Sequence, residues 1–468
     1  MEKIQIFMRR SRFLSMSILF ILFFTHCKSP DQDGVKEMSE VIEIQSVEHP
    51  DWVKDAVIYE INTRQFSQEG NFKGVEDDLS RLDELGVDIL WFMPVHPIGQ
   101  LNKKGEMGSY YSVKDYQAVN PEFGTMEDFK SLVDQAHQMG MKVILDWVPN
   151  HSAWDNPLAK EHPEWYIKDS AGVFVSPFDW TDVIQFDYDN PELREYMIES
   201  MIFWIEQTNI DGFRFDVAHM VPVDFWNSVR DTLLKVKEVF LLAEADQPVL
   251  HEEAMNMSYD WRFHHIMNEV AQGKQTAVDM RNHFHYVDTA YPENSILMQF
   301  TSNHDENSWN GTVYERLGEG VKTFAALSFT VPGMPLIYNG QEACLDKRLE
   351  FFQRDPIQWR ECELTDFYRE LIDLKEENEE LWCGDAGGNM EFISTAHEEN
   401  VLAFIREKGE NRLIALYNFS DENISLTLPE NLPDEEFMNY FSKENHRDLS
   451  GKELNLNAWD YLIFVDRE

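Results

Sequence analysis

Residues 211–219 read DGFRFDVAH, and this stretch indicates how the chain folds. Successive side chains of a β-strand point to opposite faces, and here apolar residues alternate with the others. The apolar residues are Phe213, Phe215 and Val217. Arg214 and Asp216 share the opposite face, and a buried ion pair is a costly way to stabilise a strand. The pattern predicts a buried strand whose polar face carries either a structural ion pair or a functional site.

Other apolar runs resemble strands, and together with 211–219 they alternate with helical patterns. The runs span residues 56–66, 87–96, 142–151, 211–219, 238–245, 257–263, 296–306 and 334–342. A Thr-x-x-Asp cap at Thr125 and Asp128 marks the start of one helix, and Pro191 marks another. Eight strands that alternate with helices in this way predict a (β/α)8 TIM barrel over residues 51–384.

Two segments depart from this alternation. Residues 152–186 are rich in Trp, Pro and Tyr, and they predict a short insertion after strand 3. From residue 385 to residue 468, short alternating runs such as VLAFIREKG and YLIFVDRE predict a small C-terminal antiparallel β domain. The fold class expected is therefore α/β, with a TIM barrel followed by this β domain.

Polar side chains gather at the carboxyl ends of the predicted strands. They are Asn62, His96, Asp146, Asn150, His151, Asp216, Glu244, Asn303, His304 and Asp305. The active sites of barrels of this kind lie at that face. The sequence therefore predicts a site there, and it favours the functional interpretation of Arg214 and Asp216.

Residues 1–27 have the layout of a signal peptide. Basic residues precede the apolar run FLSMSILFILFF, which is too short to span a bilayer comfortably. Cys27 follows this run as the lipidated cysteine does in a bacterial lipoprotein signal, although His26 replaces the usual small residue. An ordinary cleaved signal peptide is the alternative. We expect an extracytoplasmic protein that a lipid on Cys27 anchors to the outer membrane, with residues 28–50 as an acidic tether.

The composition limits the partners of the chain. Its 468 residues carry a formal net charge of −45, which argues against nucleic acid and favours a neutral substrate. Beyond Cys27 the cysteines are Cys344, Cys362 and Cys383, whose number is odd and whose spacing matches no metal site. One disulfide can form among them, and we expect none that matters for function.

Four motifs, each at a predicted strand end, resemble those of the α-amylase family of retaining glycosidases. They are DWVPNH (146–151), GFRFDVAH (212–219), LLAEA (241–245) and FTSNHD (300–305). The resemblance covers most of residues 51–468, and it implies a barrel enzyme that acts on α-glucans. Such enzymes use one carboxylate as the nucleophile and a second carboxyl group as the acid and base.

By this resemblance, Asp216 is the nucleophile and Glu244 is the general acid/base. Asp305 is the third carboxylate, which grips the 2- and 3-hydroxyls of the sugar. We expect Arg214 to lower the pKa of Asp216, because a nearby cation favours the ionised carboxylate. We also expect the apolar strand before Glu244 to raise the pKa of this residue. The ion pair of residues 211–219 is then interpreted as activation of a nucleophile.

The resemblance also assigns substrate contacts. His151 and His304 resemble the histidines that stabilise the transition state in this family. Tyr111 resembles the aromatic residue that stacks on the cleaved sugar, and an aromatic face suits the apolar side of a glucose ring. Tyr110 is adjacent, so the alternative register is one residue away. His219 stands where the family often has Lys or His near the +1 sugar.

Two further residues have supporting or metal-binding counterparts in the family. Asp146 is expected to orient Arg214. Asn150 matches a calcium ligand of many members, but Gln185 stands where a partner carboxylate is expected. Since Ca²⁺ prefers six or more oxygen ligands, several of them from carboxylates, we expect no calcium and no other cofactor to be required.

The function expected is hydrolysis of α-1,4-glucosidic bonds in starch-like α-glucans or maltooligosaccharides, with net retention. The same motifs serve α-glucanotransferases and neopullulanase- or α-glucosidase-type enzymes, which are the alternatives. A non-catalytic glycan-binding lipoprotein is a more remote alternative, because all three carboxylates are present.

Overall fold

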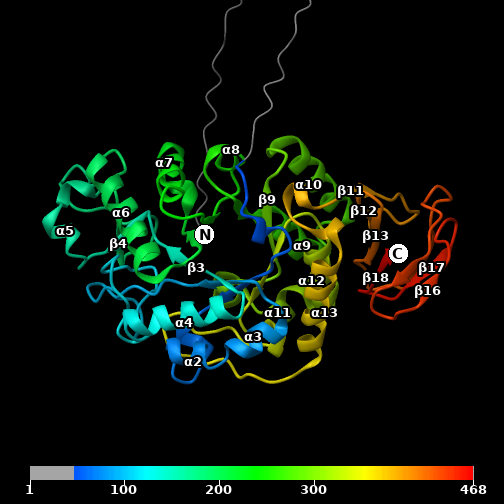
Figure 1. Ribbon diagram of the computed structural model, residues 1–468, viewed down its shortest axis with the longest axis horizontal. Coiled ribbons are helices and arrows are strands. Elements are labelled where there is room, and N and C mark those ends of the chain that lie inside the picture. The colour runs from blue at the N-terminus through cyan, green and yellow to red at the C-terminus, as the bar shows by residue number, and fades with distance from the viewer. Residues whose placement is uncertain (1–46, 467–468) are drawn as a thin grey trace, which may run out of the picture. The chain divides into compact units, whose positions relative to one another are not determined.

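The computed structural model of the protein describes residues 47–466. Eight parallel strands close into a barrel in the order β1-β10-β9-β8-β7-β6-β3-β2 (Figure 1). They are β1 (Ile58–Ile61), β2 (Ile89–Phe92), β3 (Lys142–Trp147), β6 (Gly212–Phe215), β7 (Phe240–Ala243), β8 (Met257–Tyr259), β9 (Ile296–Phe300) and β10 (Met334–Tyr338). Each predicted run contains one of these strands, so the predicted (β/α)8 barrel is confirmed.

Helices alternate with the strands and pack on the outside of the barrel, except α5, which belongs to the insertion after β3. They are α1 (Thr63–Phe66), α2 (Phe72–Glu76), α3 (Leu79–Leu85), α4 (Met126–Gln138), α5 (Leu158–Glu161), α6 (Pro191–Thr208), α7 (Val223–Leu233), α8 (Leu250–Glu253), α9 (Trp261–Ala271), α10 (Ala277–Ala290), α11 (Val313–Leu317), α12 (Val321–Thr330) and α13 (Glu363–Glu377). The predicted capping box of Thr125 and Asp128 begins α4, and Pro191 opens α6 behind the cap residue Asn190.

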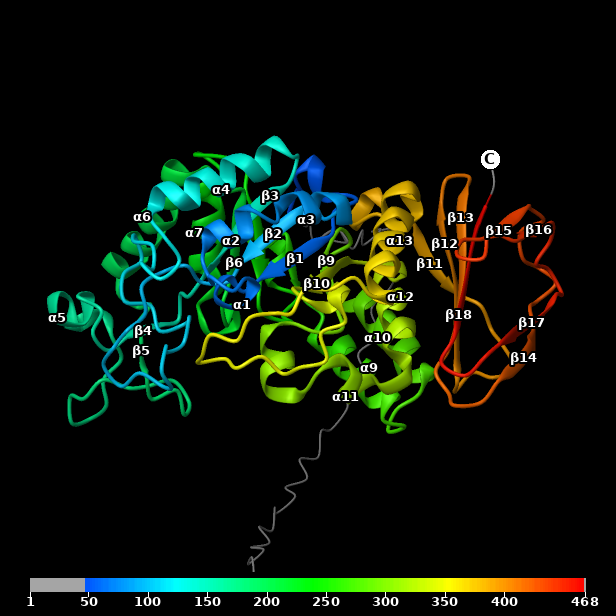
Figure 2. The same cartoon turned by 90° about the horizontal axis from the view of Figure 1, so that it is seen from below.

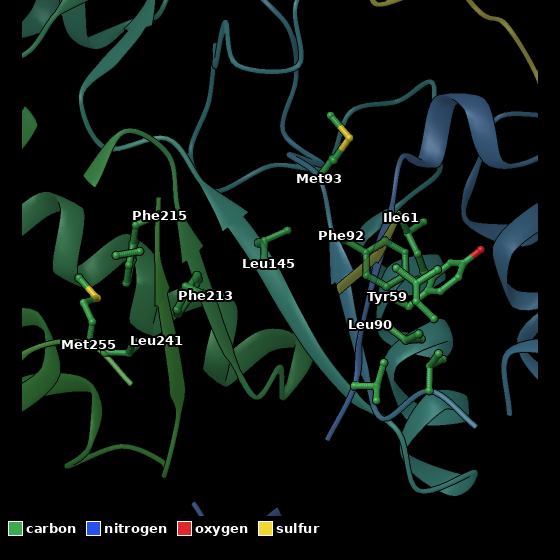
Figure 3. Close-up of a cluster of buried hydrophobic side chains, with 14 of the residues drawn as sticks. Tyr59, Ile61, Leu90, Phe92, Met93, Leu145, Phe213, Phe215, Leu241 and Met255 are labelled. Carbon is green, nitrogen blue, oxygen red and sulfur yellow. The ribbon is translucent and has the colours of Figure 1, made fainter. Parts of the chain in front are cut away.

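The side chains of the barrel strands alternate between two hydrophobic cores. Phe213 and Phe215 of β6 point outward into the core between strands and helices (Figure 3). Trp91 and Phe240 belong to a second core on the inner face of the strands. Gly212 allows β6 and β7 to approach closely, since a Cβ at this position would lie 1.9 Å from the carbonyl oxygen of Phe240.

The segment after β3 leaves the barrel and forms a small insertion. It contains β4 (His151–Ala153) and β5 (Val183–Gln185), which pair antiparallel. Helix α5 and a 3-10 turn, η2 (Pro163–Trp165), lie between them. The predicted insertion after strand 3 is therefore present.

The C-terminal strands form an antiparallel β domain, as predicted. Its main sheet has the order β11-β12-β13-β18-β15-β16, and β14 pairs with β17. The strands are β11 (Asn389–Phe392), β12 (Val401–Lys408), β13 (Asn411–Asn418), β14 (Ile424–Thr427), β15 (Phe437–Asn439), β16 (Asn445–His446), β17 (Glu453–Leu456) and β18 (Tyr461–Asp466).

This sheet packs against the barrel helices (Figure 2), with α12 beside β13 and α10 beside β12. Phe404 of β12 belongs to the same hydrophobic core as the outward side chains of the barrel. Tyr417 shares a hydrogen bond of 2.6 Å with Thr330 of α12. The buried Arg406 donates to the carbonyl oxygen of Thr330 at 2.8 Å. Barrel and sheet therefore share one core.

The described chain begins against the barrel. The carbonyl oxygen of Glu48 accepts from Arg230 at 2.8 Å, and His49 Nε2 lies 2.7 Å from the carbonyl oxygen of Asn294. Asn256, just before β8, also contacts Glu48. Residues 47–50, the end of the predicted tether, thus lie at the amino ends of β8 and β9. The predicted signal peptide, Cys27 and residues 28–46 lie outside the described residues.

The three cysteines among the described residues differ in their bonding state. Cys344 and Cys362 form the one disulfide that the sequence allowed, and the sequence had not indicated which two cysteines would pair. Cys383 is buried and free. Between residues 47 and 466, none of the helices is long and apolar enough to cross a membrane.

Candidate active site

The predicted site residues lie where the strands end. Asp146 stands near the end of β3, Asp216 follows β6, and Glu244 follows β7. His304 and Asp305 come after β9. Because the carboxyl ends of parallel strands meet at one face of a barrel, these residues converge. The three predicted catalytic carboxylates, Asp216, Glu244 and Asp305, line a single cavity of about 440 Å³.

Arg214 is fully buried, and its guanidinium contacts three carboxylates. Its Nη1 donates to Asp146 Oδ1 at 2.9 Å and to Asp216 Oδ1 at 3.3 Å. Its Nη2 lies 2.9 Å from Glu244 Oε2. Its Nε donates to the hydroxyl of Tyr259 at 3.2 Å. The structure thus brings together the pair of residues 211–219 and adds two more carboxylates to the same cation.

The pKa of Asp216 differs from the expectation. Burial raises the pKa of Asp216 well above its usual range, and the charge on Glu244 raises it further. Arg214 opposes both effects without overcoming them. Arg214 thus lowers the pKa of Asp216 as expected, but burial and the charge on Glu244 outweigh it, so the pKa is raised overall.

The backbone turns sharply after Asp216. Val217 has a φ of 39°, a left-handed conformation that is rare for a β-branched residue. Its N–H donates to Glu244 Oε2 at 2.7 Å. The strand ends at Phe215, so Val217 does not join Phe213 in the core as the alternation predicted, and it lines the cavity instead. A strained residue thus positions the carboxyl group of Glu244.

His304 is buried and charged. Its Nδ1 lies 2.5 Å from Glu60 Oε1, and its Nε2 lies 3.4 Å from Asp305 Oδ2. Burial lowers the pKa of His304, but Asp305 and Glu60 outweigh it and raise this pKa to about 9. The sequence interpretation missed Glu60, a fully buried carboxylate in the middle of β1. Its signal is the one carboxylate within the apolar run VIYEI.

Tyr111, and not Tyr110, faces the reaction centre. The Tyr111 hydroxyl lies 3.0 Å from Asp146 Oδ2 and 2.8 Å from His304 Nε2. Its ring stacks on the imidazole of His304, and it lines the cavity. The Tyr110 ring lies instead against the guanidinium of Arg64, 4.1 Å away. The register that the sequence analysis preferred therefore agrees with the structure.

His151 lines the cavity as a neutral imidazole. Burial lowers the pKa of His151 to about 3, in contrast to the charged His304. The side-chain nitrogen of Asn150 lies 3.3 Å from His151 Nδ1. Gln185 of β5 pairs with His151 across the small ribbon, so it offers a neutral amide where calcium would want a carboxylate. Neutral side chains at these positions are weak calcium ligands, and the expectation that no calcium is required stays a prediction.

His219 does not reach the cavity. It lies on η3 (Ala218–Met220), where it is exposed to solvent, and it is not among the residues that line the cavity. Its predicted contact with the +1 sugar stays a prediction.

Several aromatic side chains of the cavity wall were not predicted. Trp180 comes from the Trp-rich insertion, and its ring lies 5.4 Å from that of His151. Trp309 comes from the segment after β9, and Phe351 and Phe352 come from the loop after β10. The composition of the insertion could have indicated Trp180, whereas the loop after β10 carries no sequence signal of its own.

Asp216 and Glu244 share one guanidinium at the strand ends of a closed barrel, which fits a retaining glycosidase, and similarity to known proteins identifies the family. Residues 31–170 and 159–380 match the family model for the alpha-amylase catalytic domain. Residues 390–463 match the model for the C-terminal domain of maltogenic amylase. The chain therefore belongs to the alpha-amylase family of glycosidases, as its motifs predicted, and the non-catalytic alternative is excluded.

The relatives are named for several different enzyme activities. The chain is 26% identical to the maltogenic alpha-amylase of Bacillus acidopullulyticus over 88% of this chain and 78% of that protein. It is 28% identical to neopullulanase 2 of Thermoactinomyces vulgaris, with coverages of 78% and 72%. It is 27% identical to the alpha-amylase MalA of Haloarcula japonica over 85% of this chain, and it spans 60% of the length of MalA.

Solved structures agree with this family. The maltogenic alpha-amylase AmyB from Thermotoga neapolitana superposes with a TM-score of 0.82 at 32% sequence identity. The match covers 89% of this chain and 100% of that chain. The barrel and the C-terminal β domain are thus both features of the family.

Proposed function

We propose that the protein hydrolyses α-1,4-glucosidic bonds in starch-like α-glucans or maltooligosaccharides, with net retention of anomeric configuration. The observation that carries the proposal is the sharing of one buried guanidinium by Asp216 and Glu244 at the cavity. Retaining glycosidases need two close carboxyl groups in different protonation states. Two carboxyl groups that share one cation repel each other when both are ionised, which disfavours two charges at once. The maltogenic amylase names of relatives support the linkage.

In this mechanism, ionised Asp216 attacks the anomeric carbon while Glu244 gives its proton to the departing glycosidic oxygen. A covalent glycosyl-enzyme forms, and the part of the glucan on the other side of the cleaved bond leaves. Glu244, now ionised, takes a proton from water, which attacks the same carbon and releases Asp216. Arg214 stabilises whichever of the two carboxylates is ionised at each step. The N–H of Val217 holds Glu244 in place between the two steps.

The remaining polar groups bind the cleaved sugar. Asp305 is partly exposed to the cavity and accepts from its 2- and 3-hydroxyls. The charged His304 lies beside Asp305 and offsets its negative charge. The aromatic face of Tyr111 packs against the apolar face of the ring. These contacts favour the flattened, positively charged sugar of the transition state.

We also propose an extracytoplasmic location, with a lipid anchor on Cys27. The layout of residues 1–27 motivates it, and the disulfide Cys344–Cys362 supports it, because disulfides persist in oxidising compartments. Metabolic labelling with a fatty acid tests the anchor: wild type should be labelled and Cys27→Ser should not. If wild type carries no label, the lipid anchor is refuted, and residues 1–27 are an ordinary cleaved signal peptide.

The first experiment follows the products of purified protein from maltoheptaose over time, with the anomeric form read by NMR. Shorter sugars released as α-anomers support the proposal. Longer sugars beside shorter ones would make the protein a glucanotransferase, an alternative on the same scaffold. Cleavage of pullulan but not of maltoheptaose would favour the neopullulanase-type alternative, which the neopullulanase relative motivates. Asp216→Asn is the control, and it should abolish turnover.

A further inference from the structure

A surface segment after β2 joins two walls of the cavity. Residues 100–107 are all exposed or only partly buried, and we call them the strap. Lys104 of the strap lines the cavity together with Asp182 of the insertion and Phe352 of the loop after β10. Of the described residues that line the cavity, Lys104 alone carries an ammonium group, and the proposed reaction does not use it.

Backbone N–H groups anchor the two ends of the strap. At one end, the N–H of Gln100 donates to Asp155 Oδ1 at 3.0 Å. At the other end, the N–H of Met107 donates to the carbonyl oxygen of Phe352 at 3.0 Å. Gly105 allows a close approach there, since an added Cβ would lie 2.4 Å from the Cβ of Phe352. The ends are thus fixed, one to the insertion and one to the loop after β10.

The side chain of Lys104 holds the middle of the strap to the insertion. Its Nζ lies 3.1 Å from Asp182 Oδ1 and 3.5 Å from the carbonyl oxygen of Asp179. The side chain of Asp182 is 5% exposed, whereas that of Lys104 is 35% exposed. An ion pair with one partner in water contributes a small free energy, so it can break and re-form readily.

The rest of the strap offers little resistance to opening. Leu101 is 53% exposed, so it buries little apolar surface. Asn102 has a φ of 62°, a left-handed conformation that is typical of turns. Segments with few buried apolar contacts open at a low free energy while the core stays folded. We therefore expect the middle of the strap to lift when Lys104 leaves Asp182.

We propose that the ion pair of Lys104 and Asp182 is a latch, which closes the strap over a bound glucan and opens to admit and release it. Lys104 is then a positioning residue, because it acts through the strap and not on the bond that is cleaved. A ligand that needs the closed form binds more weakly when that form is less populated. The latch rests on the proposed function for the identity of its ligand, but its opening can be measured without turnover.

The first test follows the KM for maltoheptaose in Lys104→Met, which keeps the length of the side chain and removes its charge. We expect KM to rise about fivefold with kcat changed less than twofold, the effect of losing a partly exposed ion pair. Raising NaCl from about 0.05 M to about 1 M should raise the KM of wild type similarly, because salt screens such a pair. The KM of Lys104→Met should not respond to salt.

Two further variants separate the latch from a direct contact between Lys104 and the sugar. The charge-swapped variant Lys104→Asp/Asp182→Lys should regain most of the affinity, and a KM as high as that of Lys104→Met would overturn the latch. Lys114→Met is the matched control. Lys114 Nζ also lies 3.1 Å from a carboxylate of the insertion, that of Asp155, but Lys114 does not line the cavity. This variant should keep the KM and the salt dependence of wild type.

Proteolysis measures the opening without turnover. An endoproteinase specific for lysine can cut after Lys104 only when this side chain has left Asp182, so the cutting rate reports the open fraction. Asp182→Asn should be cut there about fivefold faster than wild type, and Lys114→Met at the rate of wild type. Equal rates in Asp182→Asn and wild type would overturn the latch. Faster cutting of Asp182→Asn, in a protein that neither binds nor cleaves maltoheptaose, would support the latch and refute the proposed function.

Discussion

Arg214 shows at the scale of one residue how this site uses a buried charge. Its guanidinium contacts Asp146, Asp216 and Glu244, so three negative groups depend on one cation. Removing one partner of a buried ionic group costs more than the group contributes to stability, because the remaining charges stay uncompensated. The three carboxylates therefore make the guanidinium hard to replace.

Arg214→Lys should lower kcat on maltoheptaose by about 100-fold, since an ammonium cannot bridge carboxylates as a planar guanidinium does. The measurement is kcat alongside the melting temperature. Arg412→Lys, at a partly buried arginine of the C-terminal sheet far from the cavity in the fold, is the control and should keep kcat. A kcat within threefold of wild type would show that the bridging geometry is unimportant.

His304 and His151 line one reaction centre in opposite charge states, and the difference comes from their neighbours. Asp305 and Glu60 raise the pKa of His304 to about 9, whereas burial lowers that of His151 to about 3. Because the pKa of His304 is raised on folding, its charge stabilises the protein below the unfolded value near 6.5. That stabilisation is lost as the pH rises through about 9.

Glu60→Gln should therefore move the basic limb of the kcat/KM profile to lower pH by about one unit. The carboxylate that Nδ1 of His304 contacts becomes a neutral amide, so the imidazolium loses its proton more readily. The pH profile of maltoheptaose cleavage measures the shift. Glu342→Gln is the matched control, because that buried carboxylate contacts Tyr59 and should leave the limb in place. An unchanged basic limb in Glu60→Gln would show that the contact between Glu60 and His304 does not set the pKa of this histidine.

Residues inside the four motifs could be predicted from the sequence, and their convergence followed from the rule that strand ends share a face. Glu60 and Trp309 could not be predicted in the same way. Glu60 meets His304, 244 positions along the chain, only because β1 and β9 both border β10. Sequence periodicity indicates a strand but not which side chains meet across the barrel.

At the scale of elements, the barrel strands and the capped helices were predictable because their patterns are local. The loop between β10 and α13 was not, because its form depends on distant contacts. Gln65 and Asn307 bind its backbone, and a disulfide joins Cys344 to Cys362. Phe351 and Phe352 of this loop line the cavity. The expectation that no disulfide matters for function stays a prediction.

Cys344→Ser/Cys362→Ser should destabilise the protein by up to about 3 kcal/mol, the value typical of a cross-link over a loop of this length. Urea unfolding with intact wild type beside it measures the change. Wild type treated with a reductant serves as the control, and it should match the double variant. An unchanged midpoint would mean that the hydrogen bonds of the loop suffice without the covalent link.

At the scale of the whole molecule, the barrel and the C-terminal sheet share one core. Phe404 of the sheet is buried in the same cluster as the outward side chains of the barrel, and Tyr417 bonds to Thr330 of α12. A shared core couples the unfolding of the two parts, so we expect a single cooperative transition between residues 47 and 466.

Phe404→Ala should lower the free energy of unfolding by about 3–5 kcal/mol, the usual cost of truncating a buried aromatic residue. Calorimetry should show one transition that moves as a whole. Leu416→Ala, on the sheet face turned away from this cluster, is the companion variant and should shift the same transition. Two separate peaks, only one of which responds to Phe404→Ala, would show that the parts unfold independently.

Residues 47–50 lie at the amino ends of β8 and β9, whereas the cavity opens at the carboxyl ends of the strands. The point at which the described chain begins and the mouth of the cavity are thus at opposite faces of the barrel. If the protein were immobilised through residues 47–50, the solid support would lie against the face of the barrel formed by the amino ends of the strands. The open face would remain free for a polymer too large to diffuse beneath an immobilised protein.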